Sequence, residues 1–446
     1  MSASHPRSRR SRLRLTVPAA AVAALALTLA ACSSGAPSAG GTGSAGGADS
    51  LNVLMISSHQ GAADYLAKRY KEETGITINP TIVPYDQIGN TLDLDQQSGA
   101  NQYDAAAVWY VSIGDLAADG SIQDLTDWID STPAIEKDDF IQSIYDPYSL
   151  VDGKRYGLPF DGDSHVLFYN KTILERNGIT SPPKTWDEYV QDSKIVTQNE
   201  GANGVYGNVI FGQKSPLILG ASFANRLAGF GGTFVDAQGK PTINSPQAVQ
   251  AAQSLVDALG SAYPTPAETD FGAGNTAWYA GKAAFIENWT DLGVGSQINP
   301  ASTVKDQWGV VPLPVGGSNT TPRASLVAGF TWVVSANTKK TQEAKDFIQW
   351  ATSSKINEEL LTADPQTGID PNRSSTLNSA SYAQKYPELA EVNHTSLNGT
   401  LPWPTGKNAT KAAEVLTDEL ANLIAGQENA QQALDKVQAQ WEQLLG

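Results

Sequence analysis

The sequence alternates short apolar runs with amphipathic helical segments, and this alternation constrains the fold more than any other feature. After residue 50, apolar runs at 51–56, 76–83 and 103–109 are separated by helical patterns, and the helices are expected to stop at Gly75 and Gly120. Strands that alternate with helices form a mostly parallel sheet covered by helices. We therefore expect an α/β fold.

A second series of strands and helices begins near Tyr156. Residues 185–188 have the spacing of a capping box, Ser245-Pro246 places a cap and a proline at the start of another helix, and the last 30 or so residues are helical. A chain of 446 residues with two such series suits two lobes better than one core.

The charge of the chain excludes one class of partner. The 46 acidic and 30 basic residues give a net charge of −16, and removal of the five arginines among the first 14 residues makes it −21: Arg7, Arg9, Arg10, Arg12 and Arg14. A body this acidic repels phosphate backbones, so we expect no nucleic-acid binding.

The N-terminus has the pattern of a targeting segment. Residues 1–31 combine an arginine-rich start with an apolar stretch, and they end in Leu29-Ala30-Ala31-Cys32, which resembles the lipobox of bacterial lipoproteins. Cys32 is the only cysteine, and we expect it to be acylated. Residues 32–50, rich in Gly, Ser and Ala, would then form a flexible tether. This predicts an extracytoplasmic protein that is lipid-anchored to the outer face of the bacterial cell membrane and contacts it through the anchor only.

Several segments together resemble one known family. They occur in order along the chain: Tyr156 to Phe160 (YGLPF), Asp163 to Lys171 (DSHVLFYNK), Pro183 to Glu188 (PKTWDE), Gly231-Gly232, Ile243 to Pro246 (INSP), Gly281 to Trp289, and Ala328 to Lys340 (AGFTWVVSANTKK). Their order resembles the extracellular solute-binding proteins of ABC importers, family 1, which are sugar-binding lipoproteins similar to the maltose-binding protein.

The resemblance implies a fold and partners. It implies two Rossmann-like lobes of the type II periplasmic-binding-protein class, joined by a hinge that the chain crosses several times, with the ligand in the cleft between them. The first lobe would hold residues 51–162 and 328–372, and the second 163–327 and 373–446. It also implies a monomeric receptor that passes a mono- or oligosaccharide or a polyol to ABC permease subunits, without a cofactor.

A sugar site needs aromatic rings against the apolar faces and polar groups around the hydroxyls. The resemblance places Trp109 and Trp289 along the cleft, with core packing an equal alternative for each. Phe330 lies on a crossing strand.

Asp161 and Asp163 are two apart on an extended segment, so their side chains share one side at about 6.6 Å. The resemblance makes Asp163 the stronger ligand contact, and a solvated Asp-Gly-Asp turn is the alternative. Four further candidates follow strand ends or match the family's P-x-R segment: His59, Gln60, Tyr85 and Arg373. A hydrogen-bonded polar loop residue is the favoured alternative for His59, and a surface arginine or an ion pair is an equal alternative for Arg373.

Two other functions, glycoside hydrolysis and metal capture, fit the sequence less well. A glycoside hydrolase needs two carboxylates on either side of the scissile bond, and Asp161 with Asp163 have a suitable separation but approach from one side. Metal capture is disfavoured because His59, His165 and His394 are far apart in the sequence and no cysteine is left after acylation. We therefore expect a binding protein with no catalytic residue and no metal.

Overall fold

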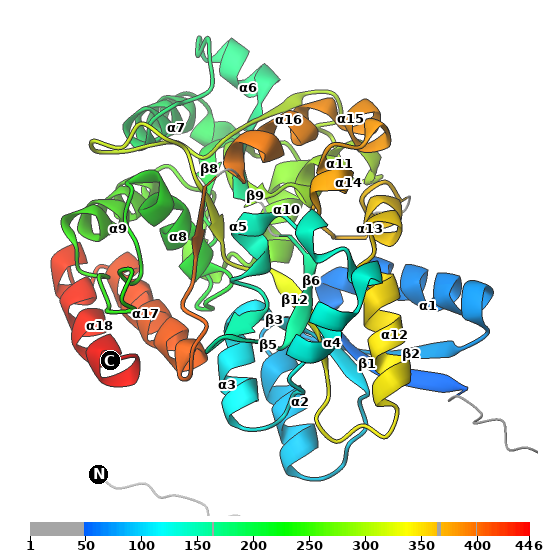
Figure 1. Ribbon diagram of the computed structural model, residues 1–446. Helices are drawn as coiled ribbons and strands as arrows, with labels where there is room; N and C mark the ends of the chain where they lie inside the picture. The colour runs from blue at the N-terminus through cyan, green and yellow to red at the C-terminus, as the bar shows by residue number, and fades with distance from the viewer. Residues whose placement is uncertain (1–48, 163–164, 364–366, 398) are drawn as a thin grey trace, which may run out of the picture. The chain divides into compact units, whose positions relative to one another are not determined.

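The computed structural model of the protein describes residues 49–162, 165–363, 367–397 and 399–446. These residues form two larger β-sheets with helices packed around them, together with two small two-stranded sheets (Figure 1). The expected targeting segment, Cys32 with most of the tether, and Asp163 lie outside the described residues.

The first sheet has five strands in the order β2-β1-β3-β12-β6. In that order the strands span Thr77–Val83, Ser50–Ile56, Ala105–Trp109, Phe330–Val334 and Gly157–Asp161. β1 is parallel to β2 and to β3, whereas β12 is antiparallel to β3 and to β6. β12 enters the sheet only after the chain has returned from the second sheet, which is why the expected mostly parallel order is broken there.

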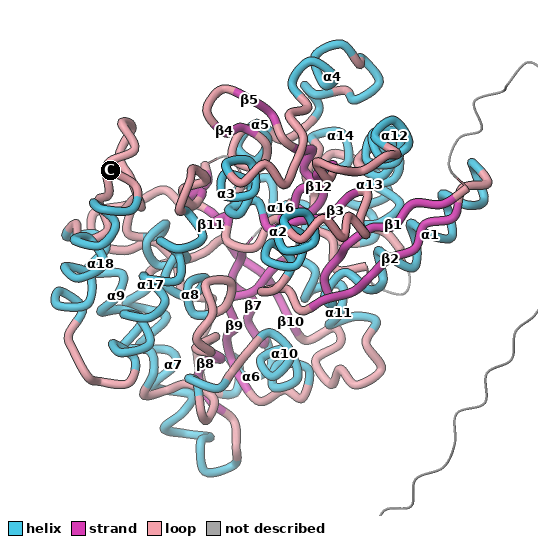
Figure 2. Tube along the Cα trace, turned by 90° about the horizontal axis from the view of Figure 1, so that it is seen from below, coloured by secondary structure: helices cyan, strands magenta, loops and turns pink. Residues whose placement is uncertain are grey.

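The second sheet has four strands in the order β10-β7-β9-β8. They span Trp308–Val311, His165–Asn170, Ala283–Trp289 and Tyr206–Val209. Only β8 and β9 are parallel, and β7 is antiparallel to both of its neighbours. In each sheet a single strand runs against the others, β12 in the first and β7 in the second, so the predicted mostly parallel arrangement is interrupted by one strand in each. Figure 2 shows these strands as a group apart from β1, β2 and β3 of the first sheet.

Helices cover each sheet separately. Four pack against strands of the first sheet: α1 Gln60–Thr74, α2 Ile88–Gln97, α5 Gln142–Tyr145 and α12 Thr341–Ala351. Four pack against strands of the second: α6 Lys171–Arg176, α7 Trp186–Glu200, α10 Phe271–Tyr279 and α16 Pro387–Ser396. A further group packs together beside the second sheet, at the left of Figure 1: α8 Leu219–Gly229, α9 Pro246–Leu259, α17 Ala409–Ile424 and α18 Ala430–Leu444.

The helix starts follow the expected caps. The Thr185 hydroxyl accepts the backbone N–H of Glu188 at 3.1 Å, and the Glu188 carboxylate accepts the N–H of Thr185 in return. The Ser245 hydroxyl accepts the backbone N–H of Ala248 and so caps α9, with Pro246 as the first residue of the helix. Both predicted helix starts are confirmed.

The chain passes between the two sheets three times. The first passage joins β6 to β7, and the second joins the short strand β11 (Ala324–Leu326) to β12. The third follows α13 (Ser354–Leu361), which packs on α12, and reaches α14 (Ser374–Leu377), which packs on α13 as well as on α15 (Ala380–Lys385) and α16. The predicted α/β fold with two lobes and a multiple hinge is confirmed. The passages bring strand ends from both sheets to one place.

Candidate ligand-binding site

A cavity with about 490 Å³ of empty space, part of it open solvent, lies between strand ends of the two sheets. The first lobe lines it with the end of β1, the turn after it, the end of β6 and the start of β12. The second lobe lines it with the end of β9 and the starts of α8, α10 and α11 (Asp291–Ile298). The third passage contributes Gly368 and Asp370 to the lining. The lining residues are Ile56, Ser58, His59, Tyr85, Asp161, Leu217, Ile218, Phe271, Trp289, Asp291, Ala328, Phe330, Gly368 and Asp370.

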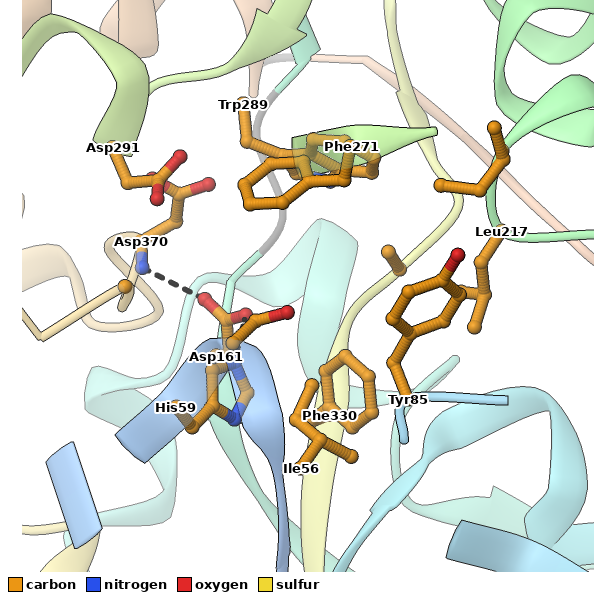
Figure 3. Close-up of a pocket in the computed structure, with 14 residues that line it drawn as sticks. Ile56, His59, Tyr85, Asp161, Leu217, Phe271, Trp289, Asp291, Phe330 and Asp370 are labelled. Carbon is orange, nitrogen blue, oxygen red and sulfur yellow. Dashed lines mark hydrogen bonds and ion pairs between the residues drawn. The ribbon is translucent and has the colours of Figure 1, made fainter. Parts of the chain in front are cut away.

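Aromatic rings form two opposite walls of this cavity. Figure 3 shows Trp289 and Phe271 on one side and Phe330 with Tyr85 on the other. The Trp289 and Phe271 rings are 5.4 Å apart at 69°, so the edge of one meets the face of the other. Trp289 comes from the second lobe and Phe330 from the first, so a flat ligand between them touches both lobes.

Carboxylates gather at one side of the cavity, to the left in Figure 3: Asp161, Asp291 and Asp370. The first of them is held on both oxygens. Oδ2 of Asp161 lies 3.1 Å from Nε2 of His59, and Oδ1 accepts the backbone N–H of Asp370 at 2.7 Å. The hydroxyl of Thr290 in turn donates to Oδ1 of Asp370 at 2.5 Å. This network ties β6, the third passage and the end of β9 together.

The strands explain why these side chains converge. Asp161 is the last residue of β6 and pairs with Phe330, the first residue of β12, so both point toward the same edge of the first sheet. Trp289 is the last residue of β9, and Asp291 follows it in the first turn of α11. Ligand sites in open α/β sheets form at such strand ends.

Tyr85 makes a direct contact between the lobes. Its hydroxyl donates to Oε1 of Gln213 at 3.2 Å, from the loop after β2 to the loop before α8. Burial, helped by the nearby carboxylates of Asp270 and Asp86, raises the pKa of Tyr85 to about 12. The hydroxyl therefore keeps its proton at neutral pH and remains a donor.

A larger groove, with about 1570 Å³ of empty space that includes open solvent, adjoins the cavity and shares Tyr85 and Leu217 with it. Trp109 lines this groove and not the cavity. It is 6% exposed, and its Nε1 donates to the carbonyl of Val327 at 2.6 Å. The structure thus places Trp109 in the adjoining groove, whereas Trp289, which was expected to lie beside it along the cleft, lines the cavity.

Two other expected residues point elsewhere. Gln60 is exposed on α1 and donates to Asp64 at 2.8 Å. Arg373 is 1% exposed, and its guanidinium donates to the carbonyls of Thr352 and Ile135 and to Asp139. Because these acceptors surround Arg373 inside the first lobe, it does not line the cavity.

The structure brings together five of the nine expected contacts: His59, Tyr85, Asp161, Trp289 and Phe330. Sequence reasoning missed Phe271, Asp291 and Asp370. Asp291 is two residues beyond Trp289, and Asp370 lies in the same GIDPNRS segment that drew attention to Arg373. Both were within reach of the sequence, whereas Phe271 follows only an ordinary helix cap, Asp270.

Within the described residues, no group of three or more His, Cys, Asp or Glu side chains has the arrangement of a metal site. In the same part of the chain, no helix has the length and apolarity needed to cross a bilayer.

Comparison with known proteins identifies the family. Residues 56–358 match the model of the bacterial extracellular solute-binding proteins. The chain belongs to this family. The match confirms the resemblance expected from the sequence of this solute-binding protein. The family consists of binding proteins rather than enzymes, and these binding proteins work with ABC transporters.

The chain is similar to two proteins in sequence and to a third in solved structure. A probable ABC transporter-binding protein of Deinococcus radiodurans is 31% identical over 295 residues, 64% of this chain and 67% of the relative. A probable amino-acid ABC transporter periplasmic-binding protein of Sinorhizobium fredii is 26% identical over 396 residues, 85% of each chain. The crystal structure of an Agrobacterium radiobacter solute-binding protein in complex with ribitol has a TM-score of 0.78 and 25% identity, covering 88% of this chain and 98% of that one.

Proposed function

We propose that this solute-binding protein is a lipid-anchored, extracytoplasmic receptor for a carbohydrate, which it delivers to an ABC importer. The observation that carries the proposal is the cavity between the lobes, where the aromatic walls of Trp289 and Phe330 meet the carboxylates of Asp161, Asp291 and Asp370. Rings cover the C–H faces of a sugar or polyol, and carboxylates accept its hydroxyl protons. The similar Agrobacterium protein was solved with ribitol, a polyol, which supports this ligand class.

The lining argues against an amino-acid ligand, which the name of the Sinorhizobium relative raises. An amino acid carries a carboxylate, and proteins usually bind that group through Arg or Lys. No Arg or Lys is among the described residues that line the cavity. An α-carboxylate would instead face three aspartates.

Nothing in the site favours a glycoside hydrolase. That reaction needs one carboxylic acid to protonate the leaving group while a second carboxylate acts from the other side of the sugar. Both oxygens of Asp161 already accept hydrogen bonds from the protein, and the three aspartates lie together on one side. This arrangement holds hydroxyls in place.

Binding would close the lobes through contacts that exist only when both reach the ligand. We propose lobes of residues 51–162 with 328–372 and of 163–327 with 373–446. We also propose that Asp163, which follows Asp161 on the first passage, contacts the ligand, and that the protein acts as a monomer. The ABC permease would recognise the closed form.

Anchoring depends on Cys32. We propose that residues 1–31 are a signal peptide, that Cys32 carries the lipid, and that residues 32–50 are the tether. Mass spectrometry of the N-terminal peptide from the native membrane should show diacylglycerol on Cys32, and Cys32→Ser should release the protein from the membrane fraction. Retention of the Cys32→Ser protein in membranes would contradict the anchor without touching the ligand proposal.

The test of function is a ligand screen by thermal shift and calorimetry. The full protein, held in a detergent without a sugar headgroup, is screened against sugars, polyols, amino acids and divalent cations. A true ligand at 100 times its Kd should stabilise the protein by about 2.7 kcal/mol. Stabilisation by amino acids with no response to any carbohydrate would refute the proposal, and release of reducing sugar from an oligosaccharide would indicate a hydrolase instead.

A further inference from the structure

Two residues separate the cavity from the groove beside it. Among the described residues, the two hollows share Tyr85 and Leu217 in their linings. Tyr85 comes from the loop after β2 in the first lobe, and Leu217 from the loop before α8 in the second. Because a side chain that lines two neighbouring hollows lies between them, these two residues form a partition between the cavity and the groove, with one residue from each lobe.

The partition is held in place by a hydrogen bond and by packing. The Tyr85 hydroxyl donates to Oε1 of Gln213 at 3.2 Å, and Gln213 belongs to the same loop as Leu217. The Tyr85 ring is half-buried and packs against the core, and Leu217 is 4% exposed. A ligand that pushes the Tyr85 ring aside must therefore break a contact between the lobes and expose apolar surface to water.

The partition bounds the end of the cavity that lies away from the carboxylates. Figure 3 shows Tyr85 and Leu217 at the right of the cavity and the carboxylates at its left, with the rings of Trp289 and Phe330 between them. A sugar ring held by these two aromatic rings, with hydroxyls toward the carboxylates, has its other end at the partition. The empty space of about 490 Å³, part of it open solvent, is near the lower end of the about 300–1,000 Å³ of small-molecule pockets.

The groove behind the partition has a lining that suits further sugar units. Trp109 lines it, and the indole is fixed by the hydrogen bond from Nε1 to the carbonyl of Val327. Two amide side chains also line it, Asn90 on α2 and Asn408 at the N-cap of α17. Aromatic rings and amides are groups that sugar sites use. The partition stands between this lining and a ligand in the cavity.

Resting on the proposed function, we propose that the partition limits the ligand to a single sugar ring or a short acyclic polyol. A second sugar unit, attached at the end of the ligand that faces the partition, would meet the Tyr85 ring and Leu217 before it reached the groove. Tyr85 and Leu217 are thus specificity-determining residues. They select the length of the ligand rather than the pattern of its hydroxyls.

The test compares ligands that share one sugar and differ in length. Calorimetry on the full protein, in the detergent of the ligand screen, uses D-glucose with maltose and maltotriose, D-xylose with xylobiose and xylotriose, L-arabinose with arabinobiose and arabinotriose, and D-sorbitol with maltitol. Any other sugar that responds in the screen is compared with its own disaccharide. In each series that binds, the shortest member should bind at least about tenfold more tightly than the next.

The outcomes separate this inference from the proposed function. Equal or tighter binding of a disaccharide or trisaccharide than of its monosaccharide would overturn the length limit and leave a carbohydrate receptor. Failure of every carbohydrate to bind protein that still shows a cooperative melting transition would overturn both.

Variants of the partition show whether it causes the length limit. Tyr85→Ala and Leu217→Ala should each raise the affinity for the disaccharide, relative to the monosaccharide, by about tenfold, because the second unit gains access to the groove. Tyr85→Phe keeps the ring in the partition and should change this ratio less than Tyr85→Ala does. Tyr263→Ala, at a half-buried tyrosine that lines neither hollow, is the matched control and should leave the ratio unchanged.

The two alanine variants alter opposite sides of the partition, so loss of folding in one leaves the other to decide. A purely structural role for Tyr85 or Leu217 would weaken binding of the monosaccharide and of the disaccharide equally. An unchanged ratio in an alanine variant that still melts cooperatively would therefore refute the assignment of that residue.

Discussion

The imidazole Nε2 of His59 lies 3.1 Å from the carboxylate Oδ2 of Asp161, and both side chains are buried at the edge of the cavity. The other oxygen of Asp161 accepts the backbone N–H of Asp370. One carboxylate thus fixes the turn after β1 and the third passage between the lobes. Asp161 therefore supports the hinge in addition to the ligand contact that we propose for it.

Asp161→Ala should therefore reduce stability as well as binding. The change leaves two buried donors, on His59 and Asp370, without an acceptor, at about 1–3 kcal/mol each. Urea unfolding without ligand should show a loss of about 3 kcal/mol. Asp161→Asn keeps an oxygen for one donor and should lose about half as much. Asp138→Ala is the control, and an Asp161→Ala protein as stable as this control would contradict the supporting role.

Trp289→Ala should weaken ligand binding by about 10- to 140-fold, because burial of an aromatic face is worth about 1.5–3 kcal/mol. Trp289→Phe keeps a ring and should lose less. Trp128 packs near Lys345 on the first lobe and is no part of the cavity lining, so Trp128→Phe serves as the control for any general effect of losing an indole. Calorimetric titration with the ligand found in the screen measures all three, and unchanged affinity in Trp289→Ala would exclude Trp289 from the site.

Removal of the Tyr85 hydroxyl should loosen the closed form. Its hydrogen bond to Gln213 joins the lobes, and such a bond contributes about 0.5–1.5 kcal/mol, so Tyr85→Phe should raise Kd by about 2- to 12-fold. Stopped-flow measurement should find the change mainly in the dissociation rate. The double variant Tyr85→Phe with Gln213→Ala completes a cycle, and additive effects of the two changes would show that this contact does not couple the lobes.

Acid should destabilise the protein through His165. Burial lowers the pKa of this imidazole from 6.5 to about 3, so the folded form stays neutral while the unfolded form takes up a proton below pH 6.5. The contribution of His165 is therefore fully present above pH 6.5 and falls by about 1.4 kcal/mol for each pH unit below it. The ring of His165 packs 4.3 Å from that of Trp289, so this loss occurs next to the cavity wall.

The measurement is urea unfolding at pH 7.5 and at pH 5, for the natural protein and for His165→Gln. The natural protein should lose about 2 kcal/mol more than the variant between these two pH values. The same pH dependence in both proteins would show that His165 does not set it.

The sequence by itself was enough for the fold class and the family. Alternating strand and helix patterns, the caps at Thr185 and Ser245, and the order of the family segments depend on local spacing, and local spacing is readable without coordinates. Trp289 and Asp161 were also within reach because both end strands, and strand ends in α/β sheets converge.

Only the tertiary structure decided where the remaining side chains point. Arg373 and Trp109 stand at plausible positions in the sequence, yet Arg373 finds acceptors inside the first lobe and Trp109 lines the neighbouring groove. The strand directions, and the position of Asp291 and Asp370 beside Asp161, depend on where the chain crosses between the lobes. Contacts between residues far apart in sequence determine those crossings. A side chain's partners follow from packing and hydrogen-bond satisfaction in three dimensions, which no local pattern encodes.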